Sequence, residues 1–195
     1  MANKIKYGIK NVYYAVATLA ANNSATYDTP VALPGAVSLT LDPEGDNSVF
    51  YADNIAYYAT YANNGYSGSL ELALIPDAFR KDVLGEIEDS KDVLVEEQGA
   101  QSVHFALIFQ FDGDEKATRY VMYNCVASRP DTASQTKEAS ISPITESITI
   151  TAAPVFNVTL NADIVKAETN SETQTTAYNS FFTTVYAPTA PSATT

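Results

Sequence analysis

Apolar and polar residues alternate along much of the chain, and this period of two predicts β-strands. The alternation is clearest in four segments, residues 36–43, 68–76, 102–113 and 144–152. In the second segment, Leu70, Leu72 and Leu74 are expected to share one buried face. In the third, every second residue from Val103 to Phe111 is apolar. Each segment is typical of a strand that packs one face on a core.

Two dipeptides predict tight turns between strands. Asn64-Gly65 follows an aromatic run and precedes another strand, and a type I′ turn requires positive φ at both of its central residues. Asp112-Gly113 stands between two further apolar segments. We therefore expect one hairpin turn at Asn64-Gly65 and a second within residues 112–116.

One short helix is predicted at about residues 76–84. Pro76 suits the first turn, where its missing N–H costs nothing. Phe79 and Val83 are four residues apart and form an apolar stripe, and Gly85 suits the position after the helix. A helix of this length needs a sheet to pack on.

These elements predict a mainly β fold: a β-sandwich or partly open barrel with one short flanking α-helix. Residues 1–160 are expected to form this domain, with the helix inserted between strands. Residues 161–195 are expected to be a C-terminal segment that is partly packed and flexible at its end.

Charge and cysteine content indicate the cellular compartment of the protein and the partners that it disfavours. The chain has 195 residues, a formal net charge of −12 and one cysteine. An acidic surface disfavours nucleic acid and anionic membranes, and a single thiol forms no disulfide within the chain. We find no signal peptide and no apolar run of membrane-spanning length. These features predict a soluble protein made in a reducing cytoplasm.

The side chains that perform chemistry are few. His104 is the only histidine, and Cys125 is the only cysteine. We expect a structural histidine and a buried, inert thiol, because neither has a partner in a recognisable motif. The stretch LDPEGDNS resembles an oxygen-rich calcium loop in composition only, and Pro43 and Gly45 favour an ordinary turn. No catalytic residue, cofactor or metal site is predicted.

Five segments carry a resemblance to a known family. In order they read KYGIKNVYYA, PGAVSLTLDPEGDNSVFYADNIAYY, NNGYSGSLELALIPDAFRKDVLGE, FALIFQFDGDEKATRYVMYNCVASRP and TKEASISPITESITITAAP. Together they resemble the major tail protein, or tail tube protein, of siphophages that infect Gram-positive bacteria. The resemblance runs from about Lys4 to Pro154, and it is weaker in AYNSFFTTVYAP.

This resemblance implies a structural virion protein rather than an enzyme. It implies homohexameric rings that self-assemble by stacking into a hollow tail tube, through which the genome is ejected into the host. A tape-measure protein would occupy the tube beforehand, and distal tail and terminator proteins would bind its ends. The subunit would be made in the host cytoplasm and would reside in the virion tail. DNA would pass without specific binding, and we expect acidic side chains to face the lumen. The inner tube of a contractile tail shares the implied fold and stays an alternative.

Assembly residues are predicted in three places. Residues 42–54 are expected to form a loop at the interface between stacked rings, with contacts from Asp42, Glu44, Asp46, Val49, Phe50, Tyr51 and Asp53. The basic residues Lys4, Lys6 and Lys10 are expected to pair with the acidic segment 86–97 of the next ring. Phe181, Phe182 and Tyr186 are expected either to form an arm on a neighbouring subunit or to complete their own sheet.

Two other classes of protein stay open. A pilin- or adhesin-like β-sandwich could use the tyrosines as a ligand surface, and it would normally carry an export signal. A β-sandwich glycosidase or lyase would need carboxylates clustered in a cleft. A tube subunit should instead show an open strand edge.

Overall fold

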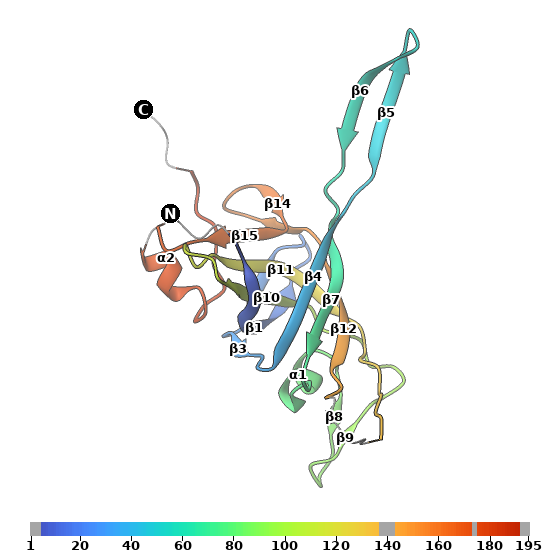
Figure 1. Cartoon of the computed structure of the whole chain (residues 1–195), viewed down its shortest axis with the longest axis vertical. Coiled ribbons are helices and arrows are strands. Elements are labelled where there is room, and N and C mark those ends of the chain that lie inside the picture. The colour runs from blue at the N-terminus through green and yellow to red at the C-terminus, as the bar shows by residue number, and fades with distance from the viewer. Residues whose placement is uncertain (1–4, 137–142, 173–174, 192–195) are drawn as a thin grey trace.

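The protein, described here by a computed structural model at residues 5–136, 143–172 and 175–191, is built mainly from antiparallel strands (Figure 1). The strands are β1 (Tyr7–Leu19), β2 (Ala25–Tyr27), β3 (Val31–Ala32), β4 (Ala36–Glu44), β5 (Asn47–Ala52), β6 (Ile55–Tyr61), β7 (Gly65–Leu72), β8 (Ile87–Glu88), β9 (Leu94–Val95), β10 (Phe105–Asp112), β11 (Arg119–Ala127), β12 (Glu146–Ala152), β13 (Val155–Asn157), β14 (Ala162–Ile164) and β15 (Lys166–Thr169). The helices are α1 (Asp77–Asp82) and α2 (Thr175–Ser180).

Nine of these strands form the main sheet, in the order β2-β1-β10-β11-β12-β7-β4, with β15 beside β11 and β3 beside β1. One hydrophobic cluster, the inner core, receives side chains from β1, β7, β10, β11 and β12 and from α1. Strand β1, next to one end of the order, and β4, at the other end, both pack against this core, so the sheet curls around it. In the described residues β4 pairs only with β7, which leaves the curled sheet open between β4 and β1. The predicted mainly β, sandwich-like fold with a short helix is confirmed.

Strand β10 is buried on both faces, where a single buried face was expected. Phe105, Leu107 and Phe109 lie in or against the inner core, while Ala106 and Ile108 belong to a second cluster on the other side of the sheet. The C-terminal segment covers that second cluster through Phe181, which is 1% exposed. A centrally placed strand with a covering segment on its outer face therefore needs apolar residues at consecutive positions.

The predicted turn at Asn64-Gly65 is wrong. Strand β5 pairs with β6, and the turn between them is Asp53-Asn54, where φ is 51° and 62°. Both residue types tolerate positive φ, so this dipeptide satisfies the type I′ requirement. Gly65 instead begins β7, at a close approach: an added Cβ would lie 2.0 Å from the carbonyl oxygen of Ala152.

The predicted turn around Pro43 and Gly45 is also wrong, because the chain does not reverse its direction there. Strand β4 continues to Glu44, and β5 resumes in the same ribbon at Asn47. The second predicted hairpin is confirmed, since β10 and β11 pair across residues 113–118. Within it, hydrogen bonds from Thr118 lower the pKa of Asp114.

Helix α1 starts after Pro76, as expected, and ends slightly earlier than expected at Asp82. Phe79 is fully buried, and its ring meets Tyr14 and Phe105 edge to face, at 5.1 and 5.7 Å. The Tyr14 hydroxyl donates to Asp82 at 2.7 Å. Burial, followed by this hydrogen bond, raises the pKa of Tyr14. Leu74, in contrast, lies beyond the end of β7 and is 67% exposed rather than buried.

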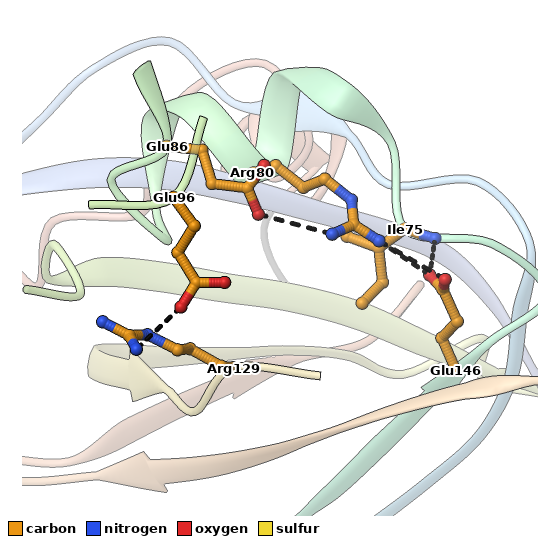
Figure 2. A network of polar contacts seen from close by, with 6 residues as sticks. All are labelled: Ile75, Arg80, Glu86, Glu96, Arg129 and Glu146. Carbon is orange, nitrogen blue, oxygen red and sulfur yellow. Dashed lines mark hydrogen bonds and ion pairs between the residues drawn. The ribbon is translucent and has the colours of Figure 1, made fainter. Parts of the chain in front are cut away.

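A polar network fastens α1 to β12 (Figure 2). Arg80 contacts Glu86 and Glu146, both at 3.3 Å, and Glu146 also accepts the backbone N–H of Ile75 at 2.7 Å. In the same view, Arg129 pairs with Glu96 at 2.7 Å, which ties the segment after β9 to the end of β11. The polar contacts therefore hold the helix and the following segment against the sheet.

Replacing Glu146 with glutamine is expected to lower the free energy of unfolding by about 1–2 kcal/mol, because a neutral amide accepts these hydrogen bonds less strongly. Urea denaturation of the purified chain measures the loss. Glu88→Gln is the control, since its pair with Lys81 is exposed to solvent and should contribute much less to stability. Equal losses in both variants would contradict a structural role for the Glu146 network.

Candidate assembly interface

The β5–β6 hairpin projects from the body of the protein as a separate two-stranded ribbon (Figure 1). We call residues 47–61 the arm. The ladder of β4 and β7 leads directly into it, and two backbone hydrogen bonds bridge the junction: Ala62 to Asp46 at 3.1 Å and Asn64 to Glu44 at 2.9 Å. The arm therefore continues the ribbon formed by two strands of the main sheet.

Large apolar side chains cover the arm but are left in solvent. The residues more than 60% exposed are Phe50, Tyr51, Ile55, Tyr57, Tyr58 and Tyr61. In the strand register Phe50 and Tyr58 lie directly opposite each other, so their side chains share one face. Neither strand of the arm pairs with any other described strand, which leaves backbone donors and acceptors free along both edges. Large apolar side chains left exposed together on one hairpin are typical of a protein–protein interface.

The residues predicted for ring stacking lie along this one ribbon. Asp42 and Glu44 are in β4, Asp46 is at the junction, and Val49, Phe50 and Tyr51 are in β5, with Asp53 in the turn. The segment is half of a long hairpin rather than the loop that was expected. In the described parts of the chain, none of these four carboxylates forms an ion pair. Their part in stacking stays a prediction.

Sequence reasoning missed the return strand of the arm. Tyr57, Tyr58 and Tyr61 lie in β6. The misplaced turn at Asn64-Gly65 paired this strand with the following strand of the body instead of with β5. The available signal was the Asp53-Asn54 dipeptide between two aromatic runs, which has the same turn chemistry as Asn64-Gly65.

The described N-terminal lysines predicted to contact the next ring lie apart from the arm. Lys4 lies outside the described residues, Lys10 pairs with Asp112, and the ammonium of Lys6 lies 4.7 Å from the centre of the Phe111 ring. Pairing of Lys6 or Lys10 with the segment 86–97 of another copy stays a prediction.

The C-terminal aromatic residues pack against their own chain. Phe182 stacks on Tyr13 at 5.1 Å, and Phe181 stacks on Tyr186 at 6.0 Å. The carbonyl of Tyr186 accepts a hydrogen bond from the hydroxyl of Tyr123 at 2.9 Å. These residues pack over the outer face of their own sheet without adding a strand to it, and a contact with a neighbouring subunit stays a prediction.

Arg119 holds this segment in place. Its guanidinium lies between two aromatic rings, 3.7 Å from the centre of Tyr178 and 4.5 Å from that of Phe182. It also donates to the carbonyl of Tyr178. Cation–π contacts with two rings favour arginine over lysine at this position. The helix α2 that carries Tyr178 was not predicted, because its sequence is rich in threonine and lacks an amphipathic period.

The two candidate reactive side chains are held in structural positions. His104 Nδ1 lies 2.7 Å from Asn124 Oδ1. Cys125 is fully buried, and burial raises the pKa of its thiol to about 12, so it is protonated at neutral pH. Across the described residues, no three His, Cys, Asp or Glu side chains converge as metal ligands would.

No helix in the described parts of the chain is both long and apolar enough to cross a bilayer. No protein-family model matches the sequence. Comparison with curated proteins also finds no match. Among solved structures, the fold is similar to a chain in the cryo-EM structure of the anti-feeding prophage baseplate, six-fold symmetrised, with a TM-score of 0.40 and 8% sequence identity. That similarity covers 87% of this chain and 97% of the other.

Proposed function

We propose that this chain is a structural subunit of a phage tail and that its activity is assembly with copies of itself. In the full form of the proposal it is the major tail tube protein of a siphophage. Six copies form a ring, and the rings stack into the hollow conduit for genome delivery. The tube holds a tape-measure protein, and terminator and distal tail proteins bind its ends.

The observation that carries this proposal is the exposed aromatic arm. A free subunit that keeps six large apolar side chains in water on one hairpin loses the stabilisation that their burial would provide, at about 25 cal/mol per Å². The arm has too little surface to bury them against itself, because a two-stranded ribbon has no second layer. A protein partner that covers the arm supplies that layer.

The direction of the arm supports an open stack rather than a closed dimer. The arm and the β8–β9 hairpin lie at opposite ends of the longest axis of the subunit (Figure 1). A copy that binds through its arm leaves its own body available to the arm of the next copy. Such a head-to-tail contact repeats along an axis and generates a filament or a stack of rings.

The net charge suits a conduit for DNA. At −12 per subunit, an assembled tube repels the phosphate backbone instead of binding it. Acidic residues on the lumen would keep the passing duplex from adhering to the wall.

Negative-stain electron microscopy of the purified chain, concentrated and left for days, tests the proposal. We expect rings or hollow tubes of uniform diameter, with large species in sedimentation velocity. A chain that stays monomeric at millimolar concentration would contradict self-assembly. Binding to a glycan panel by such a monomer would favour the adhesin class instead.

A further inference from the structure

The opening between β1 and β4 forms a groove on the side of the curled sheet. Two adjoining cavities of about 270 and 310 Å³ lie along it, and both are lined by Lys6, Leu39 and Phe111. No pairing joins β1 to β4 in the described residues, so the outer edge of β4 keeps its backbone groups free beside the groove. A free edge next to an apolar cavity is the arrangement that accepts an added strand.

The groove has an aromatic floor. Phe109 and Tyr120 stack with ring centres 5.3 Å apart, and Phe111 meets both rings, at 5.4 and 5.6 Å. Leu39 and Leu41 of β4 form the adjoining wall, and both are only partly buried. The floor can therefore receive further apolar or aromatic side chains.

Two cations that form no ion pair with the described carboxylates line this groove. Lys6 lies over the Phe111 ring, and the ammonium of Lys166 lies 5.2 Å from the centre of the Tyr66 ring. Five other described basic residues, Lys10, Arg80, Lys81, Lys116 and Arg129, form ion pairs with carboxylates of their own chain. In a chain of net charge −12, these two lysines place positive charge at the groove, although Glu168 and Asp114 also act on Tyr120 in its floor.

We propose that this groove binds the arm of a second copy of the chain, with Phe50 and Tyr58 on its aromatic floor and the acidic residues of the arm beside Lys6 and Lys166. The inference rests on the proposed function, since it names the surface that the arm uses during assembly. It joins three complementary features of the same chain: free strand edges on both sides, exposed aromatic side chains facing an aromatic floor, and unpaired charges of opposite sign.

The occupant must come from another copy. Strands β4 and β5 follow each other along one ribbon, so the arm leads away from the groove beside its own β4 (Figure 1). Asp46 at the base of the arm and Asp53 at its turn are the acidic residues nearest to its aromatic face in sequence. They bracket β5, whose six residues span about 20 Å.

A charge-reversal series tests the contact on the full chain. Lys6→Glu with Lys166→Glu is expected to raise the concentration needed for half-maximal assembly by about tenfold or more, because like charges then face each other. Adding Asp46→Lys and Asp53→Lys to the same chain should restore assembly. Lys116→Glu adds negative charge at an exposed turn outside both the groove and the segment 86–97, and this control should assemble like the wild type.

Cysteine cross-linking locates the same contact without relying on charge. Thr40 lines the groove and Ser48 shares the arm face of Phe50; both are exposed. Mixing the Thr40→Cys and Ser48→Cys chains under oxidising conditions should give a disulfide-linked heterodimer on a non-reducing gel. The buried native Cys125 does not compete.

The outcomes separate this inference from the proposed function. A wild-type chain that never assembles overturns the proposed function. A wild-type chain that assembles while the Lys6→Glu, Lys166→Glu variant assembles equally well overturns the groove alone. Cross-linking of Thr40→Cys to a cysteine placed at Val95, instead of to Ser48→Cys, would also overturn it, because the acidic segment 86–97 would then occupy the groove.

Discussion

Replacing Phe50 and Tyr58 together with serine is expected to abolish assembly while the subunit stays as stable as the wild type. Both side chains are more than 60% exposed in the free chain, so their loss should change the free energy of unfolding by about 0.5 kcal/mol or less. Electron microscopy and sedimentation velocity measure assembly, and urea denaturation measures stability.

The size of the expected effect follows from burial. Each large apolar side chain contributes about 1.5–3 kcal/mol when it is fully buried. Losing the opposed pair should therefore cost each contact about 3–6 kcal/mol, which weakens it by at least about a hundredfold. Because every stacked subunit repeats the contact, the loss recurs along the whole assembly.

Val158→Ser is the matched control for the arm variant. Val158 is 66% exposed, like the arm residues, but lies beyond β13 and outside the arm. This variant should assemble normally. Normal tubes from the Phe50→Ser, Tyr58→Ser chain, or failure of both variants alike, would contradict a specific role for the arm.

Replacing Phe181 with alanine is expected to destabilise the subunit by about 3–5 kcal/mol, the loss that a large buried aromatic ring usually causes. Phe181 is 1% exposed, and it packs in the cluster that includes Ala106, Ile108 and Val155 on the outer face of the sheet. Its removal leaves a cavity beneath the C-terminal segment and loosens the cover over β10. Urea denaturation of the dilute, unassembled chain measures the loss.

Phe182→Ala provides the comparison within the same segment. Phe182 is only partly buried, so we expect a loss of about 1–2 kcal/mol from its contacts with Tyr13 and Arg119. If the segment instead lies on a neighbouring subunit, Phe181→Ala will leave the stability of the dilute chain unchanged and will impair assembly. The two readouts together decide between the alternatives that the sequence left open.

Much of the fold was predictable because its signals are local. The alternation at residues 36–43 and 144–152 corresponds to β4 and β12, and Pro76 with Phe79 placed α1 within about two residues. The turn of the arm was misplaced because the residue types of Asn64-Gly65 suit a type I′ turn as well as those of Asp53-Asn54, although only Asp53 and Asn54 both have positive φ in the structure. Only the pairing of β5 with β6, a contact between strands, distinguishes them.

One part of the candidate interface was likewise predictable from local sequence, and another part was not. The aromatic character of Phe50 and Tyr51 marked one strand of the arm from sequence, since exposed turn-flanking aromatics suggest a contact surface. The groove could not be predicted, because it exists only where the curled sheet brings Leu39 of β4 near Phe111 of β10. Residues 72 positions apart carry no local signal of such proximity. The burial of both faces of β10 was missed for the same reason, since a C-terminal segment supplies the second cover.

The junction at Gly45 also sets how the subunit would bear a mechanical load. An added Cβ at Gly45 would lie 1.8 Å from the carbonyl oxygen of Ala62, so the two strands of the ribbon are in close contact where the body meets the arm. A pull along the arm acts parallel to β4 and β7, so the hydrogen bonds that join β7 to β12 are loaded in shear, many at once. Tension in a stack would thus pass from the arm into the nine-stranded sheet, and a stretched filament would resist extension without peeling its subunits open one bond at a time.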